Sequence, residues 1–82
     1  MIPIIQLLSK IKWDKSLKNS EFKIGYIDNV SRKIKKINYQ TMILEKNNKF
    51  SFKIIKDEKE FDIPFHRIRA VWQDNTLIWK RK

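Results

Sequence analysis

The spacing of the hydrophobic residues changes once along the chain, and this change limits the folds that are open to it. In residues 3–12, Ile4, Leu7, Leu8 and Ile11 follow the i, i+3, i+4, i+7 spacing of an amphipathic helix. From residue 21 onward, hydrophobic and polar residues alternate over short stretches, which is the period of a strand. The sequence therefore predicts one N-terminal helix followed by antiparallel strands.

Turn-forming residues divide the second part of the chain into short strands. We expect these strands at residues 21–27, 33–37, 50–55, 60–64, 67–73 and 76–81. The last two would form a hairpin around Asp74 and Asn75, and residues 38–43 an irregular connection or a single helical turn. The only glycine, Gly25, lies in mid-strand and predicts a bulge, a bend or a close approach by another backbone. The predicted class is α+β, with the helix packed on a curled antiparallel sheet or small open barrel of about five strands.

The charge of the chain is strongly basic. It has 19 Lys and Arg against nine Asp and Glu, a net charge of +10 and a pI near 10.0. Such a domain attracts polyanions, with nucleic acid ahead of an anionic membrane surface or an acidic protein. An excess of lysine, isoleucine and asparagine can also arise from genome-wide compositional drift, so charge alone indicates partners and not fold.

The length of the chain and its lack of cysteine limit the kinds of functional site that it can form. Eighty-two residues predict a single domain, residues 1–82, with a thin core and little room for a deep enclosed active site. The sequence has no cysteine, which removes disulfides, zinc–cysteine sites and thiol nucleophiles. The N-terminus lacks signal-peptide features, and no apolar run approaches the ~20 residues of a membrane span. We expect a cytoplasmic protein without a cofactor, a metal or a membrane partner.

The predicted last hairpin concentrates arginine in a chain dominated by lysine. Only four of the 19 basic residues are arginines, and Arg67 and Arg69 lie beside the only histidine, His66. With Asp74 and Asn75 as the loop, strand alternation places both arginines on one face, with Lys80 across from Arg69. Like charges opposed across strands destabilise a sheet, and a bound anion would relieve them. Because a guanidinium can hold two phosphate oxygens at once, these residues predict a phosphate clamp.

The opposite face of this hairpin is predicted to be core. It would carry Ile68, Ala70, Trp72, Leu77 and Trp79. The alternative to the clamp is that both arginines are solvated, with Asp62 or Glu60 as possible ion-pair partners.

The aromatic residues offer a second kind of nucleic-acid contact. Tryptophan rings can stack on unpaired bases. We interpret Trp72 and Trp79 as core residues. For Trp13, next to Asp14 at the end of the predicted helix, both a core position and a base-stacking position stay open. Tyr26 shares a strand face with Phe22 and is expected in the core, with its hydroxyl at the rim.

Four segments, in order, are similar to one known family. They read IPIIQLLSKIKWD, FKIGYIDNV, IPFHRIRAVW and LIWKR. In these segments the chain resembles, nearly end to end, a small archaeal domain family named for recognition of RNA cyclic-group ends. The resemblance implies an RNA-associated module, alone or joined to RNA-end-processing enzymes, that recognises ends with a 2′,3′-cyclic phosphate. At position 29 this chain has an asparagine, Asn29, where members of the family usually have a basic residue.

The resemblance and the residue analysis together define the candidate site. The motif residues of the resemblance are Trp13, Asp14, Tyr26, Asp28, His66, Arg67 and Arg69. Four further basic residues are expected to steer the RNA chain: Arg32, Lys33, Lys80 and Arg81. We expect a non-catalytic module that binds RNA 3′ ends in RNA processing or repair, with RNA-processing or RNA-ligating enzymes as further partners.

Two other classes of function compete with this interpretation. A phosphoesterase would need His66 as general acid or base, with Asp28 or Asp14 as its partner. The chain has no second histidine, no glycine-rich phosphate loop and no metal-ligand spacing. A basic adaptor would instead dock on an acidic protein.

Overall fold

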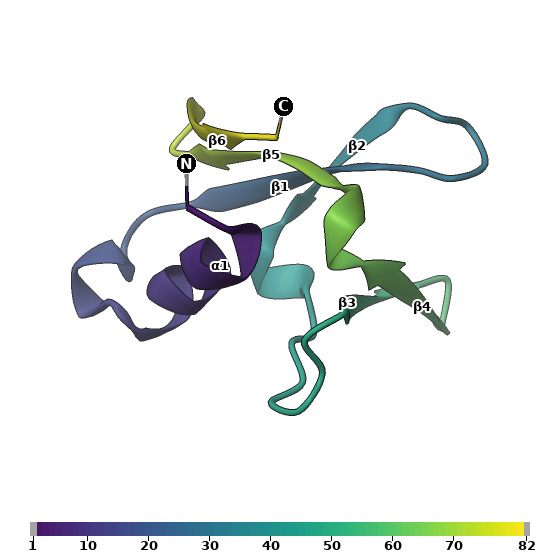
Figure 1. Cartoon of the computed structure of the whole chain (residues 1–82), viewed down its shortest axis with the longest axis horizontal. Coiled ribbons are helices and arrows are strands. Elements are labelled where there is room, and N and C mark those ends of the chain that lie inside the picture. Colours follow the sequence, from purple (N-terminus) through teal and green to yellow (C-terminus); the bar gives the residue numbers. More distant parts are fainter. Residues whose placement is uncertain (1, 82) are drawn as a thin grey trace.

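The computed structural model describes residues 2–81 and shows one α-helix, six strands and three short 3-10 helices in them (Figure 1). The helix is α1 (Ile4–Trp13) and the 3-10 helices are η1 (Lys15–Leu17), η2 (Tyr39–Thr41) and η3 (Phe65–Arg67). The strands are β1 (Phe22–Ile27), β2 (Ile34–Asn38), β3 (Ser51–Lys56), β4 (Lys59–Pro64), β5 (Ile68–Gln73) and β6 (Thr76–Lys80). Each predicted strand is present within one or two residues of its expected bounds.

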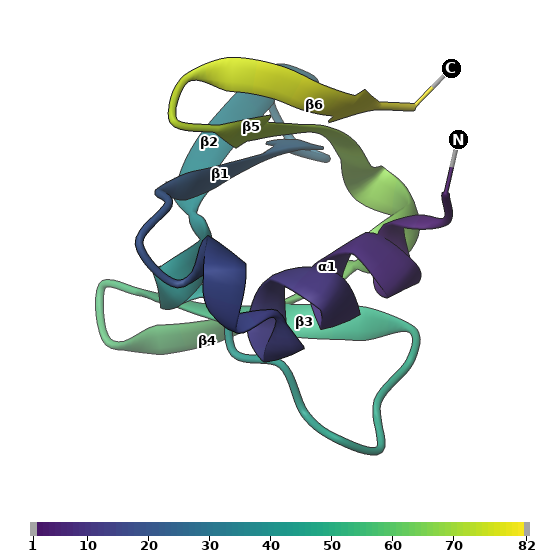
Figure 2. The same ribbon diagram turned by 90° about the vertical axis from the view of Figure 1, so that its left-hand side faces the viewer.

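The strands form two antiparallel sheets that do not close into a barrel. One sheet has the order β2-β1-β5-β6, and the other is the β3-β4 hairpin. Figure 2 shows the four-stranded sheet above, the hairpin below, and α1 along the open side between them. The predicted α+β class, with an N-terminal helix on a curled antiparallel sheet, is confirmed.

The hydrophobic core fills the space between these three layers. All four residues of the predicted helical stripe, Ile4, Leu7, Leu8 and Ile11, are buried, which confirms the helix and its inward face. The Phe52 side chain on β3 is fully buried and contacts two other rings, with centroids 6.3 Å from Tyr26 and 5.7 Å from Phe65. Phe52 therefore joins the β3-β4 hairpin to the larger sheet.

The connection after β2 is a single helical turn, one of the two outcomes expected for residues 38–43. The Asn38 side chain caps this turn, η2, by accepting a hydrogen bond from the Gln40 N–H at 3.1 Å. Because the turn redirects the chain away from the four-stranded sheet, residues beyond it reach the separate β3-β4 hairpin.

Two bulges change the predicted register around β5. In the β5-β6 hairpin, Trp72 pairs with Leu77 as expected, but beyond them Val71 pairs with Trp79. Val71 and Trp79 are consequently buried, at 0% and 6% exposure, whereas Trp72 is half-buried and Leu77 is 49% exposed. The prediction that Trp72 and Leu77 belong to the core is wrong, because one extra residue in a strand exchanges its faces. Ile68, Ala70 and Trp79 are buried as predicted.

The second bulge lies opposite Gly25 and bears on the predicted arginine face. β1 pairs Gly25 with Ala70 and Tyr26 with Ile68, so Arg69 is the extra residue of β5. A Cβ at position 25 would lie 2.8 Å from the Trp72 ring. The bulge expected at Gly25 is therefore present, and the close approach is made by a side chain and not by a backbone.

In the part of the chain that the structure describes, no helix is long and apolar enough to cross a membrane.

Candidate nucleic-acid interface

A pocket of about 280 Å³ lies between the β1-β2 turn, the β3-β4 hairpin and η3. We call it the Arg67 pocket. It is lined by Tyr26, Ile27, Asp28, Asn29, Val30, Lys35, Ile54, Lys56, Phe61, Asp62, Ile63 and Arg67. The structure thus brings together three predicted site residues, Tyr26, Asp28 and Arg67, from segments some 40 positions apart in sequence.

The position of Arg67 in this pocket is set by the turn η3. Pro64 keeps the preceding backbone extended, and Phe65 then buries its ring in the core and donates its N–H to the Phe50 carbonyl at 2.8 Å. At the other end of the turn, the Ile68 N–H bonds to the Phe65 carbonyl. Arg67 is therefore held between two buried residues, Phe65 and Ile68.

Arg81 stabilises the same turn from the C-terminal strand. Its Nε donates to the Ile68 carbonyl at 2.8 Å and its Nη2 to the Phe65 carbonyl at 3.3 Å. The guanidinium also lies 5.2 Å from the centre of the Trp79 ring. Arg81, expected to steer RNA, thus directs its guanidinium to the backbone of its own domain.

Arg67, in contrast, has no ion pair or hydrogen bond from its side chain within residues 2–81. Among the residues that it describes, the structure shows no ion pair between Arg67 and Asp62 or Glu60, the two partners considered, although Asp62 lines the same pocket. A guanidinium carries five N–H donors and no acceptor. Those of Arg67 are available to an anion in the pocket.

Asp28 organises the turn on the other side of the pocket. Its carboxylate accepts a hydrogen bond from the Ser31 hydroxyl at 2.9 Å and lies 3.3 Å from the Lys35 ammonium. The Ser31 hydroxyl and the Lys35 ammonium lower the pKa of Asp28 to about 2, from an ordinary value of 3.8, against the opposing effect of desolvation. Asp28 is therefore ionised at neutral pH and holds Lys35 at the pocket wall.

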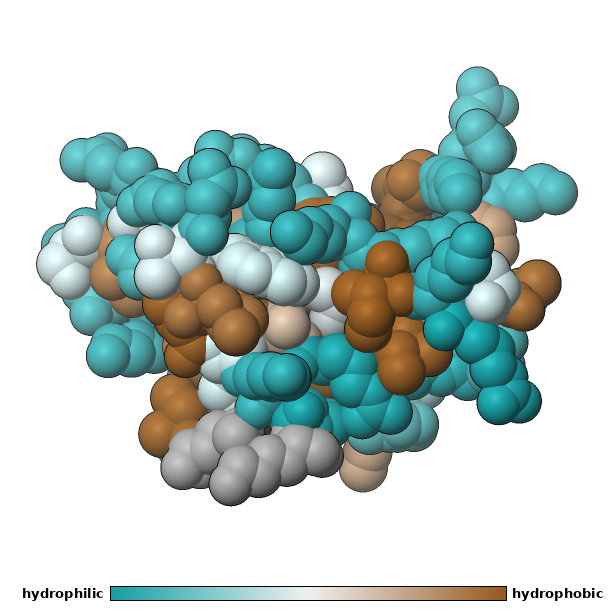
Figure 3. All heavy atoms as spheres, turned by 90° about the horizontal axis from the view of Figure 1, so that it is seen from above, coloured by the Kyte–Doolittle hydropathy of each residue, from teal (hydrophilic) through white to brown (hydrophobic). Residues whose placement is uncertain are grey.

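A second depression, of about 520 Å³, lies on the outer face of the four-stranded sheet. We call it the Trp72 groove. Its lining residues are Ile34, Lys36, Arg69, Ala70, Trp72, Leu77 and Lys80. Figure 3 views the molecule from above, the side of this sheet, and shows hydrophobic patches bordered by hydrophilic side chains. Arg69 and Lys80, both predicted site residues, line this groove, but Lys80 pairs with Ala70 across the strands and not with Arg69 as predicted.

The predicted clamp of one histidine and two arginines is consequently divided. Arg67 lies in η3 and lines the Arg67 pocket, whereas Arg69 is the bulged residue of β5 and lines the Trp72 groove. His66 is exposed on η3 and lines neither of them. The prediction that both arginines share one face is wrong, because strand alternation does not hold for a residue that the structure places in a helical turn.

The two motif residues at the end of α1 lie apart from both depressions. The Trp13 ring is 72% exposed, with the Lys12 ammonium 5.2 Å from its centre, and borders a separate pocket of about 340 Å³. Asp14 accepts hydrogen bonds from the Ser16 hydroxyl and N–H, which lower its pKa and start η1. Asp14 is a helix cap in this structure.

The remaining predicted residues, Arg32 and Lys33, are exposed in the turn between β1 and β2. Arg32 has a positive φ of 59°, and its N–H donates to the Asp28 carbonyl at 2.8 Å. The turn that carries these charges is the one that Asp28 organises.

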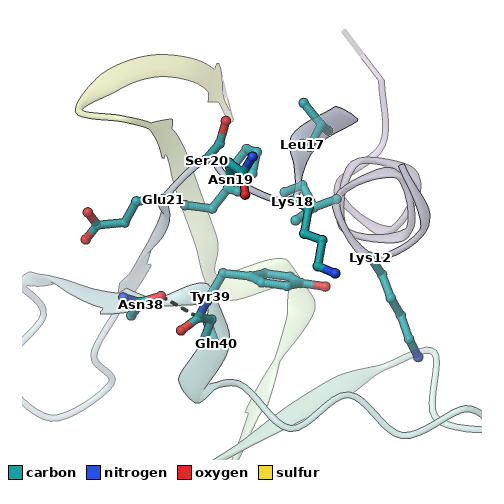
Figure 4. Close-up of a pocket in the computed structure, with 11 residues that line it drawn as sticks. Lys12, Leu17, Lys18, Asn19, Ser20, Glu21, Asn38, Tyr39 and Gln40 are labelled. Atoms are coloured by element: carbon teal, nitrogen blue, oxygen red, sulfur yellow. Dashed lines mark hydrogen bonds between the residues drawn. The ribbon is translucent and has the colours of Figure 1, made fainter. Parts of the chain in front are cut away.

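A further pocket, of about 500 Å³, separates α1 from η2 (Figure 4). In this view the Tyr39 ring extends from η2 toward α1, with Lys12 and Lys18 near it. The Tyr39 hydroxyl donates to the Leu8 carbonyl at 3.5 Å, and burial raises the pKa of Tyr39. None of the predicted site residues lines this pocket.

Five residues that complete the two depressions are not among the predicted site residues. Lys35, Lys56 and Asn29 join the Arg67 pocket, and Lys36 and Trp72 join the groove. Alternation in β2 could have separated Lys35 from Lys36. No sequence signal places Lys56 near Arg67, because that proximity depends on how the two sheets pack.

The geometry around His66 bears on the phosphoesterase alternative. Within residues 2–81, His66 makes no hydrogen bond with Asp14 or Asp28, whose side chains bond to Ser16 and Ser31. The described residues also contain no group of three or more His, Cys, Asp or Glu side chains arranged to hold a metal ion.

The fold and the two depressions define a small basic α+β domain with two cationic surface sites. The family model of the MJ1316 RNA cyclic group end recognition domain matches residues 1–81, and the chain belongs to this family. The family name supports a general role in binding RNA ends. Comparisons with curated proteins and with solved structures gave no match.

Proposed function

We propose that this domain is a non-catalytic module that binds RNA 3′ ends, and that the Arg67 pocket receives a terminal 2′,3′-cyclic phosphate. One observation carries the proposal. The segments GYID and HRIR, far apart in sequence, contribute Tyr26, Asp28 and Arg67 to one pocket in which the Arg67 guanidinium has no intramolecular partner within residues 2–81.

The charge of the pocket favours a phosphate with one negative charge. Three cationic side chains, Lys35, Lys56 and Arg67, and two carboxylates, Asp28 and Asp62, leave its wall with a net charge of +1. A cyclic phosphodiester carries one negative charge, whereas a terminal phosphomonoester carries about −1.5 to −2 at pH 7. One cyclic phosphate neutralises this wall, whereas a linear phosphate leaves part of its second charge uncompensated beside the two carboxylates, and an uncompensated charge is costly to enclose. This pocket would therefore prefer the cyclic end.

The other residues of the site take supporting roles in this proposal. Arg67 would hold the two free phosphate oxygens, and the Tyr26 hydroxyl would contact the terminal nucleotide. Asp28 and Arg81 position the two turns of the pocket. Arg32 and Lys33 attract the RNA backbone, and His66 contacts the nucleotide from the rim of η3. Such a module would deliver RNA ends to enzymes of RNA processing or repair.

The test is a fluorescence-anisotropy titration with three short RNAs that differ only at the 3′ end: hydroxyl, linear phosphate or cyclic phosphate. The wild-type protein should bind the cyclic end most tightly. Arg67→Ala should abolish this preference. The control Lys15→Ala removes one exposed charge outside both depressions and should leave the preference intact. Equal wild-type affinities for the three RNAs would reduce the function to general polyanion binding.

The enzyme alternative needs a separate measurement. The cyclic-phosphate RNA is incubated with excess protein, and the 3′ end is analysed by gel mobility and by sensitivity to phosphatase. The proposal expects an unchanged ring. Ring opening that disappears in His66→Ala would replace the binding module with a phosphoesterase.

A further inference from the structure

We propose that the Trp72 groove is a second RNA site, which binds an unpaired segment of the chain by stacking a base on Trp72 and holding phosphates with Lys36, Arg69 and Lys80. This inference rests on the proposed function and extends it from the RNA end to the nucleotides that precede that end. The groove would bind RNA with any 3′ end, so the test of the inference does not depend on the Arg67 pocket.

The first argument is the charge of the groove. Its seven lining residues include three cations and no acid. Within residues 2–81, Lys36, Arg69 and Lys80 take part in none of the ion pairs, which join other residues. A polyanion would therefore neutralise these charges without breaking an internal ion pair.

The second argument is the way in which the Trp72 ring is held. The Trp72 ring packs directly on Gly25. A Cβ added at Gly25 would lie only 2.8 and 2.9 Å from two atoms of this ring. The ring is half-buried, and the Lys36 ammonium lies 4.1 Å from its centre. A nucleobase that stacks on the ring would take the place of this ammonium, and the flexible Lys36 side chain would move to the adjacent phosphate.

The third argument is the apolar surface beside the ring. Leu77 and Ile34 are each 49% exposed and flank Trp72 in the groove. A second copy of this chain is a poor occupant, because a two-fold interface would place the three cations of one copy against the same three of the other. RNA satisfies both the apolar and the cationic parts of the surface.

The groove and the Arg67 pocket meet at the edge strand of the sheet. β2 is the outermost strand in the order β2-β1-β5-β6, and Lys35 and Lys36 are consecutive in it. Lys35 lines the Arg67 pocket and Lys36 the groove. One RNA strand could therefore cross this edge, with its end in the pocket and the preceding bases in the groove.

The inference is tested with single-stranded RNAs that carry a 3′-hydroxyl and are about two, four and eight nucleotides long. Wild-type affinity should rise with length. Trp72→Leu should lower affinity for the longest RNA about five- to 150-fold, the range expected when one base stack is removed. Phe50→Leu is the matched control, because Phe50 is 84% exposed and lies outside the groove. Its affinity should equal that of the wild type.

A double variant provides a second test that remains valid if Trp72→Leu fails to fold. Lys36→Ala with Arg69→Ala should reduce the slope of log affinity against log salt by about 1.4, which is about 0.7 for each phosphate of a single strand that the variant no longer neutralises. The inference is overturned if both variants bind the longest RNA as the wild type does. It is also overturned if the free protein is a dimer that Trp72→Leu dissociates, since the groove would then be a protein interface.

Failure of this inference and failure of the proposed function give different results. Trp72→Leu should keep the ratio of affinities for cyclic and hydroxyl ends, and Arg67→Ala should lose this ratio but keep the length dependence. Loss of the ratio in Trp72→Leu would contradict the separation of the two sites.

Discussion

Single residues in this domain decide which side chains line its two cationic depressions. Gly25 allows the Trp72 ring to lie against the sheet, and Arg67, in the turn η3, lines a different depression from Arg69. Asp28 fixes the turn and the lysine beside Arg67. The shapes of the two proposed sites thus depend in part on Gly25 and Asp28, which hold other residues in place.

Gly25→Ala should displace the Trp72 ring. A Cβ would lie under 3 Å from two ring atoms and 3.2 Å from Ile34 Cγ2, so the ring must move outward. Because the ring is half-buried, we expect a stability loss of only about 1 kcal/mol. The affinity for long single-stranded RNA should fall in parallel with a change in tryptophan fluorescence. An unchanged emission spectrum and affinity would contradict this account of the glycine.

Asp28→Asn should alter the dependence of stability on acid pH. The pKa of Asp28 is about 2 in the folded protein and ordinarily 3.8, so its ionised form stabilises the fold above pH 4. That contribution is lost as pH falls from about 4 to about 2. The melting temperature of the wild type should therefore decline in this window more than that of Asp28→Asn. Parallel curves for the two proteins would contradict the assignment.

At the scale of elements, the turn η3 depends on a side chain from the other end of its hairpin. Arg81 follows β6 and donates to two carbonyls, those of Phe65 and Ile68, at the two sides of Arg67. The element that carries HRIR is therefore completed by the segment LIWKR. This interaction gives a physical reason for both segments to be present.

Arg81→Lys should lower both stability and end selectivity. A lysine ammonium cannot reproduce the two-carbonyl geometry of the guanidinium, and charged hydrogen bonds contribute about 1.5–3 kcal/mol each. Since Arg81 is only half-buried, we expect a loss of about 1–2 kcal/mol in urea unfolding. Lys80→Ala, an exposed neighbour, serves as the stability control. Unchanged preference for the cyclic end would show that Arg81 does not position Arg67.

The elements could be predicted from the sequence where their periods are unbroken, and the site could be predicted only in part. The α1 stripe and the strands follow directly from hydrophobic spacing, and Trp79 was correctly expected in the core. Strand alternation failed for Trp72 and Leu77, because each bulge inserts a residue that no local pattern marks, and for Arg67, because it lies in the turn η3. The Arg67 pocket required the packing of two sheets, which is a non-local property.

At the scale of the whole molecule, the Arg67 pocket depends on how the β3-β4 hairpin meets the four-stranded sheet, and the Trp72 groove does not. The hairpin contributes Lys56 and Asp62 to the Arg67 pocket, while the groove lies on the sheet alone. The buried ring of Phe52 holds the hairpin in place through Tyr26 and Phe65. Damage to this junction should therefore affect the pocket before it affects the groove.

Phe52→Leu tests this separation. The smaller side chain leaves a cavity between the sheets, with an expected loss of about 1–3 kcal/mol in unfolding free energy. Because the four-stranded sheet keeps its own pairing, binding of 3′-hydroxyl RNA in the groove should persist while the preference for cyclic ends weakens. Ile55→Ala, which changes an exposed residue of the same strand, should alter neither property. Equal loss of both kinds of binding in Phe52→Leu would mean that the two sites form one cooperative surface, since a junction defect confined to the pocket cannot reach the outer face of the sheet.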